Sequence, residues 1–301
     1  MIMRGVKKVR EQLQNLLEMR VQQCVSHKNG KNKCLKIEKK KETLLKRGAE
    51  IVKAKARGKI ISRNEANDMT KVLYKVHFKY LTKQKDTFFL EEEIEQRNAN
   101  FYKGILVEDH EINPFDIQIP SVPEEDLLPT DQANSSDRMS YQYDRLKAVQ
   151  YAERWWNDYN PAYKKFEVDC TNFISQCLHA GGAPMTGFPN RSNGWWMRNN
   201  NWSYSWTVAN SLRLYLSRAK TGLRAKEVKS PDQLLLGDVI CYDFQGDGRF
   251  DHNTMVTGKD VNGMPLVNAH TYNCRMRYWA YEDSTAYTPN IKYKFYSIAD
   301  D

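Results

Sequence analysis

The stretch VDCTNFISQCL at residues 168–178 decides how the C-terminal half of this 301-residue chain is interpreted. Apolar side chains recur at helical spacing over residues 173–178, and a Gly-Gly pair at 181–182 ends the pattern. Asp169 stands where a helix N-cap is expected. The pattern therefore predicts a short helix whose first residue is Cys170.

A cysteine at the start of a helix suits nucleophilic chemistry. The positive end of the helix dipole is expected to lower the pKa of the Cys170 thiol. The unpaired backbone N–H groups of the first turn, including that of Cys170, can hold an oxyanion. Cys177 falls on the apolar stripe and Cys241 lies in an apolar run, so both are expected to be buried bystanders.

Two further segments carry histidines on predicted strands. GDVICYDF at 237–244 reads as a turn into a strand, and DHNTMVTG at 251–258 reads as a second strand that begins at His252. A hairpin turn at 261–264 then leads to a third strand that ends at His270. The pattern predicts an antiparallel meander behind the cysteine helix.

This order of a helix with Cys170, a Gly-Asp strand, and strands with His252 and His270 resembles the NlpC-type and papain-like superfamily of cysteine peptidases. The strings DCTNFISQ and DHNTMVT more closely resemble the type-6 amidase domain family of spore-forming bacteria. The resemblance covers about residues 141–295. It implies a papain-like fold in which N-terminal helices pack on an antiparallel sheet.

The resemblance also implies roles for single residues. Cys170 would attack an amide carbonyl, and His252 would accept its proton and return it to the leaving amine. His270 would orient the imidazole as the third member of a Cys-His-His triad, with Asn268 as the alternative because both side chains point the same way. Tyr163 is a candidate second oxyanion donor.

A Trp-rich segment at 190–206 offers two interpretations. Trp195 and Trp196 would bind substrate if the segment forms a groove wall, or fill the core if it folds on itself. No metal or cofactor is expected, because the six cysteines show no paired zinc spacing. The acidic residues at 243–251 are expected to form a turn, since their spacing fits a calcium loop poorly.

The N-terminal half has a different pattern. Residues 4–24 and 36–57 are predicted to form a helical hairpin, and residues 71–82 alternate apolar and basic side chains as a strand with one wet face does. Residues 85–95 and 98–108 are predicted to complete an antiparallel β-meander. We find no catalytic residue pattern in this part of the chain.

The expected fold class is α+β with three parts. Residues 1–110 form the helical hairpin and β-meander domain, residues 111–140 a Pro-rich acidic linker, and residues 141–301 the papain-like domain. The last of these is expected to open with a helix over 141–160.

Charge is concentrated at the N-terminus. Residues 1–60 hold 18 Lys or Arg and 5 Asp or Glu, a net charge of +13, so the rest of the chain must carry −4 of the total of +9. Such a segment is either a solvated pair of Lys-rich helices or a contact surface for an anionic polymer or membrane. No apolar run approaches the length of a transmembrane segment, and no signal peptide is recognised.

The sequence therefore predicts a cysteine-dependent amidohydrolase or peptidase that acts on a peptide or amide substrate from peptidoglycan or spore material. The expected location is cytoplasmic or spore-associated. Two alternatives stay open: a thiol acyltransferase that uses the same site, and a non-catalytic binding module that acts through the basic N-terminal domain.

Overall fold

The computed structural model describes residues 2–26, 34–113 and 141–300. They fall into two compact units, which we describe separately. The N-terminal unit comprises the chain up to Asn113 together with Tyr281–Thr285, and the C-terminal unit comprises the remainder. The protein is α+β, as expected. Most of the predicted linker, residues 114–140, lies outside the described residues.

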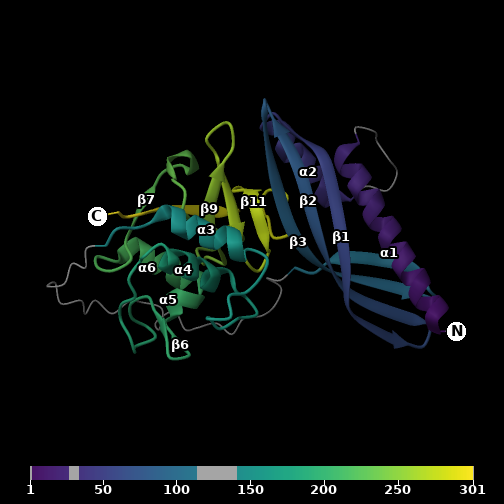
Figure 1. Ribbon diagram of the computed structural model, residues 1–301, viewed down its shortest axis with the longest axis horizontal. Helices are drawn as coiled ribbons and strands as arrows, with labels where there is room; N and C mark the ends of the chain where they lie inside the picture. Colours follow the sequence, from purple (N-terminus) through teal and green to yellow (C-terminus); the bar gives the residue numbers. More distant parts are fainter. Residues whose placement is uncertain (1, 27–33, 114–140, 301) are drawn as a thin grey trace. The chain divides into compact units, whose positions relative to one another are not determined.

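The N-terminal unit consists of two helices and a four-stranded antiparallel sheet (Figure 1). Its elements are α1 (Ile2–Val25), α2 (Leu35–Lys46), β1 (Ala49–Ala66), β2 (Met69–Gln84), β3 (Thr87–Tyr102) and β4 (Ile105–Glu111). The strands follow each other in the order β1-β2-β3-β4 through hairpins. Each hairpin turn begins with a residue of positive φ, which matches the twist of the flanking strands.

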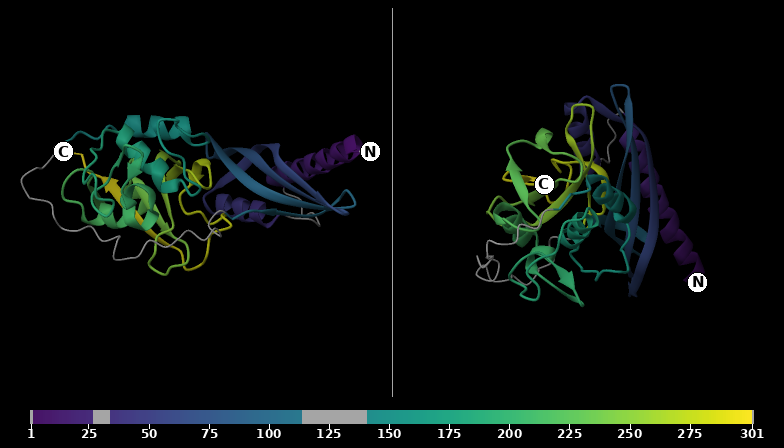
Figure 2. Two further views of the ribbon diagram at one scale, coloured as in Figure 1. Left: turned by 90° about the horizontal axis from the view of Figure 1, so that it is seen from below. Right: turned by 60° about the vertical axis from the view of Figure 1, so that its left-hand side comes forward.

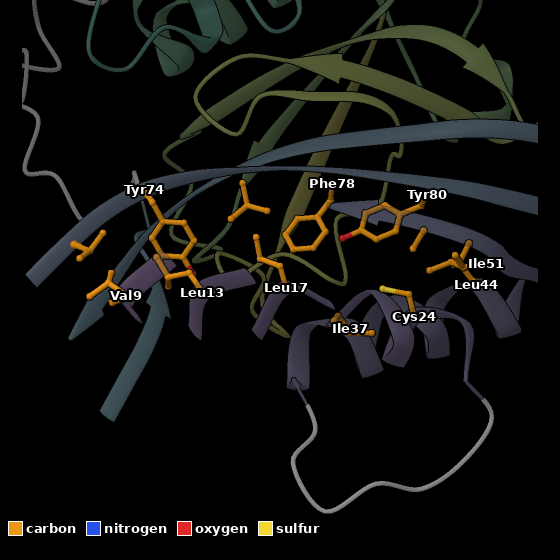
Figure 3. Packing of buried hydrophobic residues seen from close by; sticks show 14 of the residues in the cluster. Val9, Leu13, Leu17, Cys24, Ile37, Leu44, Ile51, Tyr74, Phe78 and Tyr80 are labelled. Carbon is orange, nitrogen blue, oxygen red and sulfur yellow. The ribbon is translucent and has the colours of Figure 1, made fainter. Parts of the chain in front are cut away.

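The core of this unit lies between the helices and one face of the sheet. Val9, Leu13 and Leu17 of α1 pack with Tyr74 and Phe78 of β2, and all five side chains are buried (Figure 3). In each view α1 runs along one face of the long strands (Figures 1 and 2). The alternation in residues 71–82 correctly predicted which side chains of β2 are buried.

Two predicted boundaries in this unit were wrong. The helix predicted over 36–57 ends at Lys46, because Gly48 adopts a left-handed φ of 68° and the chain continues as β1 from Ala49. The alternation that begins at Ala54 was concealed by a β-bulge between Ile51 and Lys53. The third strand also extends further than predicted, so that Phe101 belongs to β3.

The C-terminal unit is a six-stranded antiparallel sheet with helices. Its helices are α3 (Arg145–Trp155), α4 (Cys170–Ala180), α5 (Tyr204–Thr207), α6 (Ala209–Arg218) and the 3-10 turn η3 (Pro231–Gln233). Its strands are β5 (Met197–Arg198), β6 (Asn201–Trp202), β7 (Ala225–Val228), β8 (Val239–Asp243), β9 (His252–Lys259), β10 (Pro265–Ala269), β11 (Cys274–Tyr278) and β12 (Lys292–Ile298).

The sheet order is β11-β10-β9-β8-β12-β7, and β5 pairs only with β6 in a separate ribbon. Helices α3 and α4 contact the same face of the sheet. Asn268 of β10 donates to Glu153 of α3 at 2.8 Å, and Asn253 of β9 donates to Thr171 of α4 at 3.0 Å. The predicted meander of β8, β9 and β10 is confirmed, whereas the helix predicted over 141–160 is limited to α3.

None of the helices in the described residues has the length and apolar character that crossing a bilayer requires.

Candidate active site

Cys170 is the first residue of α4, as predicted. Asp169 occupies the N-cap position, but its side chain makes no capping hydrogen bond to the helix backbone. Instead its Oδ1 accepts from the backbone N–H of Phe166 at 3.0 Å and from Asn172 Nδ2 at 2.9 Å. These bonds fix the approach to α4 and turn Oδ2 toward another partner.

That partner is His270, which follows the end of β10. Its Nδ1 lies 2.8 Å from Asp169 Oδ2, and its Nε2 lies 2.7 Å from the carbonyl oxygen of Trp155. Each of the two ring nitrogens therefore lies against an acceptor oxygen. The ring also stacks on Phe173 of α4 with centroids 4.0 Å apart. His270 therefore links β10 to the start of the cysteine helix.

Thr271 connects the same two elements through its hydroxyl group. Its Oγ1 accepts from the backbone N–H of Asp169 at 3.0 Å and from that of Cys170 at 3.1 Å. Its φ is 74°, a conformation that a β-branched residue rarely adopts and that costs about 1–3 kcal/mol. Sequence reasoning missed Thr271. The N–H of Cys170, predicted to be an oxyanion donor, is occupied by this hydroxyl.

The thiol itself is buried, with Cys170 only 2% exposed. Its Sγ lies 3.7 Å from Thr171 Oγ1 and 4.0 Å from the carbonyl oxygen of Asp251. Burial raises the pKa of the Cys170 thiol, and hydrogen bonds from Thr171 and the backbone of Asn253 oppose the rise only in part. The expected lowering of this pKa by the helix dipole is thus outweighed by desolvation.

His252 begins β9, as predicted, but its ring lies on the face of the strand opposite to Cys170. It pairs across strands with Tyr242, whose ring centroid is 5.6 Å away, and Phe244 is 6.1 Å away. The next residue, Asn253, points to α4, and side chains of a strand alternate between faces.

The structure therefore brings the backbone on both sides of His252 to the thiol, but not the imidazole. Burial, followed by the charge of Arg277, lowers the pKa of His252 to about 3. The ring is therefore neutral at pH 7. The predicted Cys170–His252 pair stays a prediction.

The other residues singled out from the sequence have structural surroundings. Trp195 and Trp196 are 0% and 1% exposed, so the Trp-rich segment follows the core interpretation. The ring of Tyr163 stacks on Trp206 with centroids 6.2 Å apart.

Asn268, the alternative orienter, is engaged on all sides. Its Oδ1 accepts from Thr257 Oγ1 at 2.7 Å and from the N–H of Met276 at 2.9 Å, and its amide nitrogen donates to Glu153. It holds β9, β10 and β11 together with α3.

The acidic turn after β8 also has a structural explanation. The Asp243 carboxylate accepts from the backbone N–H groups of Gly246, Asp247 and Gly248 at 2.6–3.2 Å. Among the described residues, no group of three His, Cys, Asp or Glu side chains is arranged to hold a metal ion.

Comparison with known proteins identifies the C-terminal unit. A family model described as "Putative amidase domain" matches residues 142–296. The chain belongs to this family. The matched residues run from before α3 into β12 and include Cys170 at the start of α4 and His270 after β10. The family description indicates a hydrolase that acts on amides.

Two proteins of Bacillus subtilis (strain 168) resemble this chain. The uncharacterized protein YhbB is 54% identical over 272 residues, which cover 88% of this chain and 86% of that protein. The uncharacterized protein YjcM is 31% identical over 140 residues, which cover 44% of this chain and 31% of that protein. No solved structure matches the chain.

Proposed function

We propose that the protein is a cysteine-dependent amidohydrolase with a papain-like site. In this proposal Cys170 is the nucleophile, His252 is the general base, and His270 positions the start of α4. The observation that carries the proposal is the convergence of three segments. The start of α4 lies against the start of β9, through Cys170 Sγ and Asp251 O, and against the end of β10, through Asp169 and His270.

The reaction follows from these roles. His252 takes the proton of the Cys170 thiol, and the thiolate attacks the amide carbonyl to form a tetrahedral intermediate. The C–N bond breaks as the imidazolium protonates the amine, leaving a thioester on Cys170. Water, deprotonated by the same imidazole, then attacks the thioester and releases the acid. Each proton is returned, so the enzyme is regenerated without a cofactor.

The described arrangement corresponds to a resting state in this scheme. The thiol is buried with a raised pKa, and His252 faces away from it. For proton transfer the imidazole must come within about 3 Å of the sulfur. We propose that substrate binding turns the backbone at 251–252 so that His252 reaches Cys170. The hydrogen bond from the Cys170 N–H to the Thr271 hydroxyl would then break, and the N–H would donate to the substrate oxygen instead.

The substrate class we propose is a peptide amide of cell-wall or spore material. The test uses the full chain with purified muropeptides, and with cross-linked spore peptides, followed by mass spectrometry. Cys170→Ala is expected to lower the rate at least about 1,000-fold, as the loss of a nucleophile does. Cys177→Ala is the matched control, because it removes a buried thiol from the same helix at a distance from the site.

The histidine variants distinguish the proposed base from the positioning residue. His252→Gln is expected to abolish turnover, and also the labelling of Cys170 by a substrate-like peptide that carries a thiol-reactive group, because the imidazole reaches the thiol only when substrate is bound. His270→Gln is expected to lower turnover without changing the pH dependence of the remaining rate. Activity in Cys170→Ala equal to that of the control would overturn the nucleophile. Full activity in His252→Gln, with none in His270→Gln, would assign the base to His270 instead.

Product analysis decides between hydrolysis and acyl transfer. The reaction is run with added glycine amide or a muropeptide amine as a competing acceptor. Hydrolysis predicts the free acid as the product at every acceptor concentration. An amide formed with the acceptor in proportion to its concentration would show that the thioester is passed to an amine, and the assignment as a hydrolase would be wrong.

A further inference from the structure

A groove of about 940 Å³ runs between α1 and β1 of the N-terminal unit. Its helix wall is one face of α1, with side chains three or four residues apart. These residues are Arg10, Leu13, Gln14, Leu17, Glu18, Val21 and Gln22. Its sheet wall is formed by residues 54–60 of β1 together with Tyr74. The volume lies within the range of pockets that hold ligands.

The groove follows the open edge of the sheet. Successive side chains of a strand point to opposite faces, so a pocket on one face would contact only every second residue. Residues 54–60 line the groove without a gap. In the described part of the chain β1 pairs only with β2 and is the end strand of its sheet. Alternate residues of β1 therefore direct their N–H and C=O groups away from β2 and into the groove.

The two flanks of α1 differ in how they are held. On the flank facing β4, Gln12 bonds the carbonyl of Gly104 at 2.8 Å and the N–H of Leu106 at 2.9 Å, and Arg20 pairs with Asp109 at 2.5 Å. Among the described residues, no hydrogen bond or ion pair joins α1 to β1. On the side toward β1, the helix is held by apolar contacts, such as that of Leu17 with Gly58.

The edge strand is strongly basic on its outer face. Lys55, Arg57 and Lys59 are exposed, and none of them has an ion-pair partner among the described residues. Their cross-strand partners in β2 are Lys79, His77 and Lys75. Lys59 and Lys75 are like charges placed directly opposite each other, which destabilises a sheet, whereas Lys79 and His77 both contact the Glu92 carboxylate. An anionic neighbour on the free side of β1 would offset the charge of Lys59 and give Lys55 and Arg57 a partner.

We propose that an extended, acidic segment of another polypeptide binds in this groove as an added strand on β1. Its backbone would pair with the free N–H and C=O groups of the edge. Its outward side chains would be carboxylates beside Lys55, Arg57 and Lys59. Its inward side chains would be apolar, because Ala56, Ile60 and the Leu17 face of α1 line that side.

The same features select against a second copy of this chain. Two β1 edges brought together would place their lysines and arginines side by side, a device by which proteins protect sheet edges from self-association. An acidic strand meets no such repulsion. A segment that alternates acidic and apolar residues can hydrogen-bond the edge strand, pair with its basic side chains and pack on the apolar wall at once. A polyanion without a peptide backbone can only pair with the basic side chains.

The test measures binding of labelled nine-residue peptides to the full-length protein by fluorescence polarisation. The probe alternates Glu and Val. One control has the same composition with the Glu residues in a block, and a second carries N-methyl groups on the amides that would face β1. The probe is expected to bind at least about tenfold more tightly than either control, because only it offers both the backbone bonds and the matching alternation.

Variants of the protein locate the site. The double variant Arg57→Glu with Lys59→Glu is expected to weaken binding of the probe at least about tenfold, since it reverses two charges beside the added strand. The matched control is Lys71→Glu with Lys85→Glu, which makes the same change of charge at exposed positions of β2 and its turn, neither of them opposite Lys55, Arg57 or Lys59. The control is expected to change affinity by less than about threefold.

Each other outcome overturns the proposal. Equal affinity for the probe and both control peptides would show an unspecific anion surface. Tighter binding to vesicles of anionic phospholipid than to the probe would assign the surface to a membrane. Equal losses in the two double variants would move the site away from the edge. Catalysis is not part of the measurement, so failure here leaves the proposed amidase function unaffected.

Discussion

The neutral, buried imidazole of His252 makes the stability of the C-terminal unit sensitive to acid. Its pKa falls from 6.5 to about 3 on folding, because burial disfavours the charged ring. The folded protein therefore binds fewer protons than the unfolded chain between these two values. Unfolding becomes easier as the pH drops through 6.5, and the loss is complete below about pH 3.

The size of the effect follows from the two pKa values. At pH 5 the unfolded imidazole is almost fully protonated, whereas the folded one is almost fully neutral. The proton-binding difference lowers the free energy of unfolding by about 2 kcal/mol relative to pH 7. Because the side chain is fully buried, solvent screening does not reduce this figure. Substitution by Gln removes the titration and keeps a polar group of similar size.

The assay is urea unfolding at pH 7 and pH 5, followed by tryptophan fluorescence. All seven Trp residues lie between positions 155 and 279, so the signal reports the C-terminal unit alone. Losses from other titrating groups are shared by the wild type and His252→Gln, and cancel in the difference. The wild type is expected to lose about 2 kcal/mol more than the variant. Equal losses in both proteins would refute the reasoning.

Burial raises the pKa of Asp251 to about 6, so the charged carboxylate opposes folding above that pH. Asp251→Asn is therefore expected to stabilise the C-terminal unit at pH 7.5 by about 1 kcal/mol, a figure reduced because the side chain is partly exposed. Urea unfolding measures the gain, which is expected to be absent at pH 4. Lys40 pairs with the buried Glu91 at 2.5 Å. Lys40→Met leaves that carboxylate without the lysine and is expected to destabilise the N-terminal unit by about 3 kcal/mol. A thermal melt followed by circular dichroism measures the loss, and an unchanged melting temperature would contradict the prediction. Gly194 has a φ of 67°, and a Cβ added there would overlap a backbone oxygen. Gly194→Ala is therefore expected to lower the free energy of unfolding by more than about 3 kcal/mol. The control Gly263→Ala, whose added Cβ meets open space, is expected to lower it by about 1 kcal/mol.

Local patterns were sufficient to predict much of the fold. The helix from Cys170, the hairpin of β9 and β10, and the buried alternation of β2 all follow from spacing within ten or so residues. The end of α2 was missed because a β-bulge interrupts the alternation of β1 directly after the helix. A long helix and a short helix followed by a bulged strand have similar apolar spacing in this segment.

The site was less predictable because it depends on contacts between distant segments. The facing direction of His252 is set by which residue of β9 reaches α4, and this choice is not visible in the order of residues. The pairing of Asp169 with His270 joins residues 101 positions apart. Thr271 could have been suspected only as a hydroxyl next to a candidate histidine at a strand end, which is a weak signal.

Tyr281–Thr285 belongs to the N-terminal unit although it lies within the sequence of the amidase domain, and this arrangement has an evolutionary consequence. Asp283 lies in this segment and pairs with Lys40 of α2 at 2.7 Å. The family match at 142–296 contains the segment, so a gene rearrangement that transfers the amidase domain also transfers this carboxylate. A descendant that kept only the first 113 residues would lose an anion beside a buried lysine. Lys40 would keep its pairing with Glu91, so the lysine would be left with one carboxylate instead of two, and the net charge of that buried site would change by one unit.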